Sequence, residues 1–157
     1  MLAKARDVMT RKFSSLLPQM TVMEAIRLLK VAGAEEGNRI FGMVVIDDAG
    51  HLVGMLSMYD ILPLLRPLNI PDWDFMDDQE VDALMDAIGD RVKTTQVQAI
   101  MTPDLITITP ETHVVKILDI MIRRHIRRLP VVDSQRMVGM VYISDIFDHL
   151  GDRLLSH

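Results

Sequence analysis

The chain contains an internal repeat, which restricts its fold more than any other feature of the sequence. Residues Val8–Leu29 align with Ile100–Met121 at an offset of 92 residues, and both segments contain a Met-Thr pair followed by a Pro. Further along, Met43–Leu62 aligns with Leu129–Phe147, and both of these segments hold a Gly-Met pair followed by an Asp. A pattern that occurs twice in one chain predicts two similar structural units, which bury a hydrophobic core by packing together.

Each copy predicts the same order of secondary structure. An extended piece that ends at Pro18 or Pro110 precedes a helix; Thr21 followed by Glu24 is a capping box that begins the first of these helices. Two runs rich in Val and Ile, joined by a polar turn, then predict a hairpin, and a closing helix begins near Asp60 or Asp145. The apolar residues fall at helical spacing in both first helices: Val22, Ala25, Ile26 and Leu29, and Val114, Ile117, Leu118 and Met121. The predicted fold class is α/β (α+β), with two β-α-β-β-α repeats.

The repeats are predicted at residues 1–68 and 97–157, and an acidic helical linker at 69–96 separates them. Residues 72–90 contain eight acidic side chains and no basic one. Apolar residues at helical spacing predict a helix over 76–88 that ends at Gly89. Neither calcium-loop spacing nor a His accompanies the carboxylates, which favours a solvated helix over a metal site.

Composition narrows the classes of function. The 49% hydrophobic and 25% charged residues are typical of a soluble globular protein, and the net charge of −5 argues against nucleic-acid binding. The chain has no Cys, which excludes disulfides, Cys-ligated metals and thiol catalysis. Neither a signal peptide nor an apolar run long enough to span a membrane is visible, so a cytoplasmic location is expected. The common catalytic motifs are absent and the five His residues lack metal-ligand spacing, which predicts that the chain is not an enzyme.

The ordered set "MT…P", "RRLPVVD" and G-x-x-x-x-x-D resembles the cystathionine-β-synthase (CBS) domain family over residues 5–150. The two copies resemble a tandem CBS pair, or Bateman module. The resemblance implies two CBS domains related by a pseudo-two-fold axis, with their sheets packed face to face. It also implies clefts that bind AMP, ADP, ATP or S-adenosylmethionine, and a disc-shaped homodimer.

The resemblance assigns roles to the repeated Asp and its neighbours. In nucleotide-binding members this Asp accepts hydrogen bonds from the ribose hydroxyls, which makes Asp60 and Asp145 the ribose candidates. Ser57 is the phosphate-binding hydroxyl of the first copy, whereas Tyr142 occupies that position in the second. The alternative is structural, because Ser57-x-x-Asp60 is also a helix capping box, and one carboxylate can serve both roles.

The arginine run before the second hairpin adds candidates for phosphate binding. The resemblance places Arg127 and Arg128 at the phosphates, although basic residues at the end of a helix also complement its dipole. The first copy has Phe41 and Gly42 at these positions, so one good site is expected rather than two. Residues that match the family's base-contacting positions are Thr107, Ile108, Ser15, Leu16 and Pro130.

The predicted function is a stand-alone regulatory module that binds an adenosine nucleotide in an inter-repeat cleft and signals to a separate, unidentified protein. It needs no catalytic cofactor and forms a homodimer. The alternative is a ligand-free dimeric scaffold that uses the acidic helix to bind partners. Nucleic-acid binding through the arginine run is a further alternative, which the net charge disfavours.

Overall fold

The computed structural model describes residues 3–35, 42–66 and 76–156. The chain divides into two compact units that are interleaved along the sequence. The terminal unit comprises Met1–Phe13, Asp48–Leu52 and Leu105–His157, and the central unit comprises Ser14–Asp47 and Val53–Asp104. The domain boundaries expected from the sequence, after residues 68 and 96, stay a prediction.

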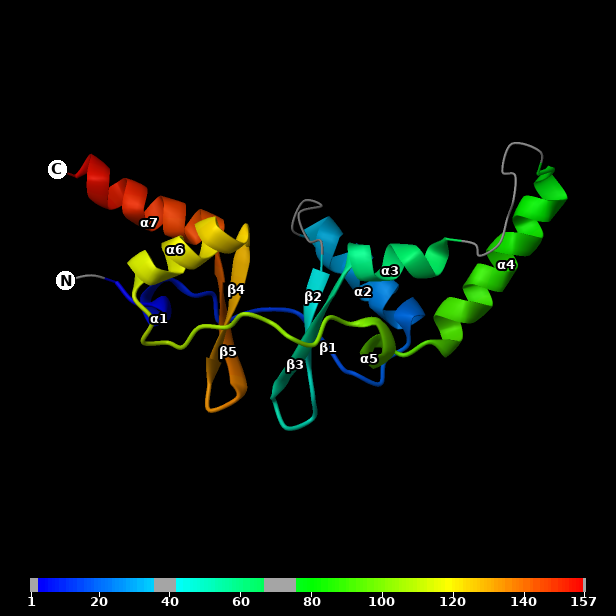
Figure 1. Ribbon diagram of the computed structural model, residues 1–157, viewed down its shortest axis with the longest axis horizontal. Coiled ribbons are helices and arrows are strands. Elements are labelled where there is room, and N and C mark those ends of the chain that lie inside the picture. Colours follow the sequence, from blue (N-terminus) through cyan, green and yellow to red (C-terminus); the bar gives the residue numbers. More distant parts are fainter. Residues whose placement is uncertain (1–2, 36–41, 67–75, 157) are drawn as a thin grey trace. The chain divides into compact units, whose positions relative to one another are not determined.

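The central unit is built on a three-stranded sheet with the order β1-β2-β3 (Figure 1). Strand β1 runs parallel to β2 and places Ser15 opposite Val44. The elements are β1 (Ser15–Leu16), α2 (Val22–Glu35), β2 (Gly42–Ile46), β3 (Leu52–Ser57), α3 (Met58–Leu65), α4 (Asp78–Thr94) and α5 (Val97–Ile100). The predicted start of the first long helix is confirmed, because the Glu24 amide donates a hydrogen bond of 3.2 Å to Thr21 Oγ1.

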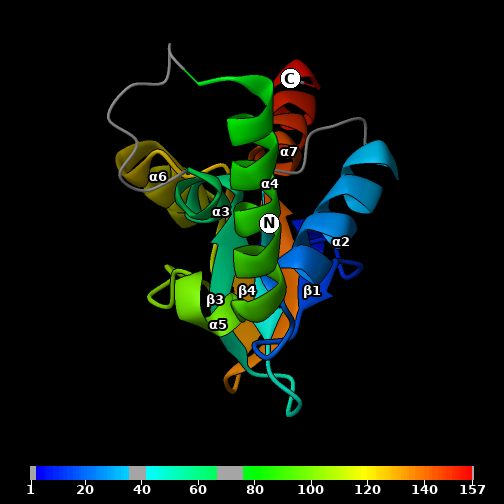
Figure 2. The same cartoon turned by 90° about the vertical axis from the view of Figure 1, so that its right-hand side faces the viewer.

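The acidic helix is longer than the sequence predicts. Helix α4 passes through Gly89 and ends at Thr94, so the predicted stop at Gly89 is wrong. It continues because Ile88 and Val92 are buried where α4 packs against α2 and α3 (Figure 2). Burial of apolar residues on both sides of a helical Gly outweighs the roughly 1 kcal/mol that Gly costs in a helix.

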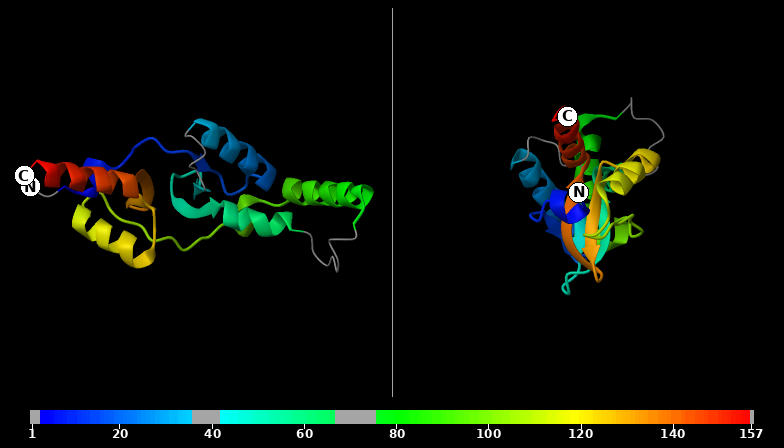
Figure 3. Two further views of the ribbon diagram at one scale, coloured as in Figure 1. Left: turned by 90° about the horizontal axis from the view of Figure 1, so that it is seen from above. Right: turned by 90° about the vertical axis from the view of Figure 1, so that its left-hand side faces the viewer.

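The terminal unit contains one antiparallel hairpin, a short helix, and two longer helices, α6 and α7, that lie side by side (Figure 3). Its elements are α1 (Ala5–Val8), α6 (Val114–Arg124), β4 (Arg128–Asp133), β5 (Arg136–Tyr142) and α7 (Ile143–Leu155). Ile108 bridges to Val131 in parallel and so takes the place of the first strand. Both repeats therefore show the predicted β-α-β-β-α order, with the first strand of the second copy reduced to this bridge.

Each unit is completed by the segment that opens the other repeat. In the terminal unit, the Thr10 amide donates to Met140 O at 2.8 Å and the Met140 amide donates back to Thr10 O at 2.9 Å. In the central unit, Met55 and Thr102 exchange the equivalent pair of hydrogen bonds, both at 2.9 Å. The repeated Met-Thr pair thus extends a hairpin strand of the opposite copy.

This exchange explains why a Gly precedes each of the repeated Met residues in the hairpins. A Cβ on Gly54 would lie 2.8 Å from both Met101 Sδ and Thr102 O. A Cβ on Gly139 would lie 2.7 Å from Met9 Sδ. Only Gly allows another backbone to approach a strand so closely. The Gly-Met and Met-Thr pairs of the sequence are therefore two sides of one packing contact.

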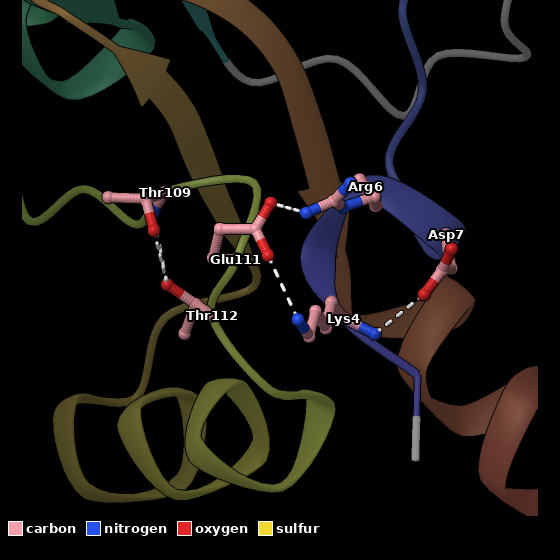
Figure 4. A network of polar contacts seen from close by, with 6 residues as sticks. All are labelled: Lys4, Arg6, Asp7, Thr109, Glu111 and Thr112. Atoms are coloured by element: carbon pink, nitrogen blue, oxygen red, sulfur yellow. Dashed lines mark hydrogen bonds and ion pairs between the residues drawn. The ribbon is translucent and has the colours of Figure 1, made fainter. Parts of the chain in front are cut away.

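Backbone hydrogen bonds and a small ionic network attach the N-terminal segment to the terminal unit (Figure 4). The Ala5 amide donates to Thr112 O at 2.8 Å, and Glu111 forms ion pairs with Lys4 and Arg6. Exposed ion pairs contribute about 0–1 kcal/mol. The backbone bonds and the buried Ala5 side chain therefore hold this segment more strongly than its charges do.

Candidate functional site

Asp60, the ribose candidate of the first repeat, is a helix-capping residue. Helix α3 begins directly after Ser57, whose amide and hydroxyl donate to Asp60 Oδ2 at 2.8 and 3.1 Å. The other carboxylate oxygen, Oδ1, accepts a hydrogen bond of 3.2 Å from Thr102 Oγ1. The capping interpretation of Ser57-x-x-Asp60 is thus confirmed.

Thr102 is a partner of this site that the sequence analysis did not identify. It belongs to the second repeat, but its backbone pairing with Met55 brings its hydroxyl to Asp60 in the central unit. The signal that could have found it is the Met-Thr pair that opens both copies, which above served only to align the copies and to support the family resemblance.

Asp145 is the equivalent residue of the second repeat, and it has fewer partners. Its Oδ2 accepts a hydrogen bond of 3.0 Å from the Tyr142 amide at the start of α7. A carboxylate has about four acceptor positions. Within the described residues, Asp60 uses three of them and Asp145 uses one. Asp145 therefore has more capacity to accept hydrogen bonds from a ligand.

The end of helix α6 positions the arginine run beside Asp145. His125 has a left-handed conformation with a φ of 53°, and this residue ends α6 and turns the chain into β4. Arg128 then lies opposite Tyr142 across the hairpin, and Arg127 O accepts a hydrogen bond of 2.8 Å from the Ile143 amide. Both arginines consequently adjoin the first turn of α7, where the amide dipoles favour an anion.

The earlier arginines have a different environment. Arg123 Nε donates to Asp119 Oδ1 at 2.9 Å, one helical turn away on α6. This contact, together with its place in the last turn of the helix, fits a structural role in stabilising the helix end.

The candidates for contact with the base differ in how far their side chains are exposed to solvent. Ile108 is buried, its amide donates to Pro130 O at 3.0 Å, and its carbonyl accepts from the Val132 amide at 2.8 Å. Leu16 and Pro130 are also buried, whereas Thr107 and Ser15 are exposed. The side chains of Thr107 and Ser15 are therefore accessible to a ligand, whereas those of the three buried residues are not. The roles of all five residues stay a prediction.

The terminal unit gathers most of the predicted residues at one edge of its hairpin. Ile108 joins Pro130 through a backbone bond, Arg128 lies opposite Tyr142, and Tyr142 is bonded to Asp145. The central unit holds Ser15, Leu16, Ser57 and Asp60, but Phe41, at the position that corresponds to Arg127, lies outside the described residues. This edge therefore combines a carboxylate, which accepts hydrogen bonds from hydroxyl groups, with an arginine pair and a helix N-terminus, which attract anions.

Comparison with known proteins identifies the family. The model of the CBS domain matches residues 5–66 and 97–152, which correspond to the two copies of the repeat. The chain belongs to the CBS domain family. The resemblance inferred from the sequence motifs is thereby confirmed, and the chain is a tandem CBS pair.

Individual CBS relatives match most of the chain. The CBS domain-containing protein YhcV of Bacillus subtilis is 26% identical over 145 residues, covering 92% of this chain and 84% of that protein. The structure of CBSX2 in complex with AMP has a TM-score of 0.69 at 24% identity, covering 97% of this chain and 98% of that one. The cytosolic domain of the Mg²⁺ channel MgtE in complex with ATP has a TM-score of 0.68 at 26% identity, covering 94% of this chain and 48% of that one.

In the described part of this chain, none of the helices is both long and apolar enough to cross a membrane.

Proposed function

We propose that this CBS pair is a regulatory module that binds an adenosine-containing nucleotide and transmits the binding event to a separate protein. Relatives with the same fold have been solved with AMP and with ATP, which supports this class of ligand. The observation that carries the proposal is the polar edge of the terminal unit, where Arg127, Arg128 and Asp145 lie around the start of α7.

In this proposal Asp145 is the principal ribose acceptor. Binding both ribose hydroxyls takes two acceptor positions, and Asp145 provides them while keeping its bond to the Tyr142 amide. Asp60 has about one position left, so it would lose a bond from Ser57 or Thr102 when it accepts two hydroxyls. We infer that nucleotide binds preferentially to the terminal unit.

Arg127 and Arg128 supply the positive charge for the phosphates, and Tyr142 borders the same space. Arg side chains present planar sets of N–H donors that match phosphate oxygens. Thr107, which is exposed next to the buried Ile108, is the candidate for contact with the base.

The test is a calorimetric titration of AMP, ADP, ATP and S-adenosylmethionine, with GMP as the control ligand. Asp145→Asn removes a charged acceptor, and a hydrogen bond to a charged group contributes about 1.5–3 kcal/mol. The expected loss of affinity is therefore about tenfold or more, whereas Asp60→Asn is expected to cause a smaller loss.

The matched control separates ligand binding from helix capping. Asp7 caps α1 in the same way, because Asp7 Oδ2 accepts a hydrogen bond of 2.9 Å from the Lys4 amide. Asp7→Asn therefore removes the charge from an equivalent capping contact without touching the proposed site, and it should leave affinity unchanged. A chain that binds none of the nucleotides, or an Asp145→Asn variant that binds as tightly as the wild type, would contradict the proposal.

A homodimer is part of this proposal, and nucleotide changes what a partner recognises only if it binds one of two states of the dimer more tightly. A second candidate function is a ligand-free scaffold that uses α4. It is favoured by the exposed N-terminal half of α4, where Val81 and Met85 lie among carboxylates. The titration distinguishes the two, because the scaffold binds none of these nucleotides.

A further inference from the structure

Helix α4 has an apolar stripe that is buried in one half of the helix and exposed in the other. Val81, Met85, Ile88 and Val92 are spaced four, three and four residues apart, which places them on one face. Ile88 and Val92 are 6% and 3% exposed, whereas Val81 and Met85 are 42% and 58% exposed. In Figure 1 the exposed half is the end of α4 that lies farther from α2. The face that attaches α4 to the central unit thus continues uncovered toward its N-terminus.

The exposed half of α4 is also strongly acidic. Residues 77–90 contain six carboxylates and neither Lys nor Arg. The six are all exposed: Asp77, Asp78, Glu80, Asp82, Asp86 and Asp90. Among the described residues, none of these carboxylates forms an ion pair. Such a surface repels other anions, including nucleic acids, acidic lipid headgroups and a second copy of α4. We call Val81 and Met85, with the adjoining Asp82 and Asp86, the α4 outer face.

Both ends of α4 hold this face in a fixed helical form. At the start, Asp77 Oδ1 accepts a hydrogen bond of 2.8 Å from the Glu80 amide and so caps the helix. Beyond the exposed half, Arg91 Nη1 donates to Leu64 O at 3.1 Å and joins α4 to the end of α3. A short helix without such attachments is only marginally stable in water. A partner therefore meets a helix that is already ordered, which lowers the entropy cost of binding.

We propose that the α4 outer face binds a basic amphipathic helix of the separate protein to which this module signals. Val81 and Met85 pack between apolar side chains of that helix, because residues four apart form the ridges through which helices pack. Lys and Arg side chains beside the partner's apolar stripe pair with Asp82 and Asp86.

The inference rests on the proposed function, which requires a separate partner, and goes beyond it by naming the surface and the chemistry of that partner. It also differs from the ligand-free scaffold, because α4 binds the partner while the Asp145 edge binds nucleotide. The flexible thioether of Met85 suits a surface that adapts to the apolar side chains of another helix.

The probe is a fluorescein-labelled synthetic peptide of about 18 residues, or about five helical turns. It has Leu along one helical face and Lys and Ala elsewhere. Fluorescence anisotropy measures its binding to the full chain at about 0.15 M salt. One control peptide has the same composition with Leu distributed around the helix, and another has Glu in place of every Lys. The probe should bind at least about tenfold more tightly than either control, and less tightly as salt is raised.

Substitutions on α4 locate the binding face. Val81→Gln and Met85→Gln remove apolar contacts without changing the charge, and both residues are exposed, so the double variant is expected to fold. It should bind the probe about tenfold or more weakly than the wild type. Phe147→Gln is the matched control, because Phe147 is an exposed apolar residue on α7, which is also acidic. It should leave the affinity for the probe unchanged.

The contribution of charge is tested by a second matched pair of variants. Asp82→Asn combined with Asp86→Asn should weaken binding of the probe about fivefold and reduce its dependence on salt. Asp148→Asn combined with Asp152→Asn removes the same charge from α7 and should have little effect.

A probe that binds no better than the control peptides would overturn the inference. So would α4 variants that bind as tightly as the wild type, or a loss in Phe147→Gln as large as that in the α4 double variant. Light scattering of the protein alone tests the other occupant. If Val81→Gln with Met85→Gln lowers the molar mass of the assembly, the α4 outer face binds a second copy and the inference is wrong.

Titration of the α4 double variant with AMP keeps this inference separate from the proposed function, because the Asp145 edge is unchanged. Binding of AMP without binding of the probe would contradict the α4 assignment alone. Binding of the probe by a wild type that binds none of the nucleotides would support the α4 assignment and contradict the nucleotide proposal alone.

Discussion

Substitution of Gly54 by Ala tests the exchange of segments between the repeats. The added Cβ would lie 2.8 Å from both Met101 Sδ and Thr102 O, whereas 3.4–4 Å is ordinary contact. Thr102 O accepts the Met55 amide at 2.9 Å, so moving it disturbs a pair of backbone hydrogen bonds. Overpacking costs about 1–3 kcal/mol, and each weakened bond adds about 0.5–1.5 kcal/mol. We expect a loss of about 2–4 kcal/mol in the free energy of unfolding.

The equivalent change at Gly139 should be milder. Its nearest neighbours are Sδ and Cγ of Met9, at 2.7 and 3.0 Å, and the backbone oxygen of Thr10 lies further away at 3.2 Å. Because a flexible Met side chain can move aside, we expect a loss of about 1–2 kcal/mol. Combining Gly139→Ala with Met9→Ala should give a total loss smaller than the sum of the two single changes.

Urea denaturation of the variants measures these differences, and a loss of 1 kcal/mol corresponds to about 2–4 °C in Tm for a chain of this size. Gly89→Ala is the control, because a Cβ there meets nothing within 4 Å and Gly89 lies inside α4. It should stabilise the protein by about 0.5–1 kcal/mol. A Gly54→Ala variant as stable as the wild type, or no less stable than Gly139→Ala, would refute the exchange.

Three further outcomes follow from the structure. Gln135 has a φ of 71° in the β4–β5 turn, so Gln135→Gly should raise the unfolding free energy by about 1 kcal/mol, measured by urea denaturation. Gly50 has a φ of 84°, so Gly50→Ala should lower that free energy by about 1–2 kcal/mol in the same assay. Arg127→Gln should weaken AMP binding about tenfold, with adenosine binding nearly unchanged, because the proposed contact is to phosphate; calorimetry with both ligands checks this.

Most of the architecture was predictable from the sequence. The repeat indicated two similar units, and the apolar periodicity within each copy indicated its helix and its hairpin. The buried faces of α2 and α6, including Val22, Ala25, Val114 and Ile117, follow from that spacing. The stop at Gly89 was predicted wrongly, because the packing of Ile88 and Val92 decides how far α4 extends. Periodicity within one helix does not report such contacts between elements.

The exchange of opening segments was not predictable from the sequence. Met9-Thr10 and Met101-Thr102 pair through their backbones with distant strands, and backbone pairing leaves little trace in residue choice. The trace that exists is the Gly of each Gly-Met pair. The conformations of Ser134 and Gln135 were also unexpected, because both have positive φ values without the Asn-Gly sequence that usually marks such a turn.

For the candidate site, the sequence indicated the candidate residues but not the hydrogen bonds that they form within the chain. The same Gly-to-Asp pattern caps α3 and α7, and only the hydrogen bonds distinguish Asp60, with three, from Asp145, with one, among the described residues. The difference arises largely from Thr102 and the Ser57 hydroxyl, and Tyr142 replaces that hydroxyl in the second copy.

The most direct test of nucleotide binding at the Asp145 edge is calorimetric titration of AMP into the wild type, Asp145→Asn and Asp7→Asn. The account predicts saturable binding by the wild type and Asp7→Asn, and affinity at least about tenfold lower for Asp145→Asn. Equal affinity in all three proteins would contradict the assignment of Asp145 as the ribose acceptor. No binding of AMP or of the other adenosine nucleotides by the wild type would contradict the proposed function itself.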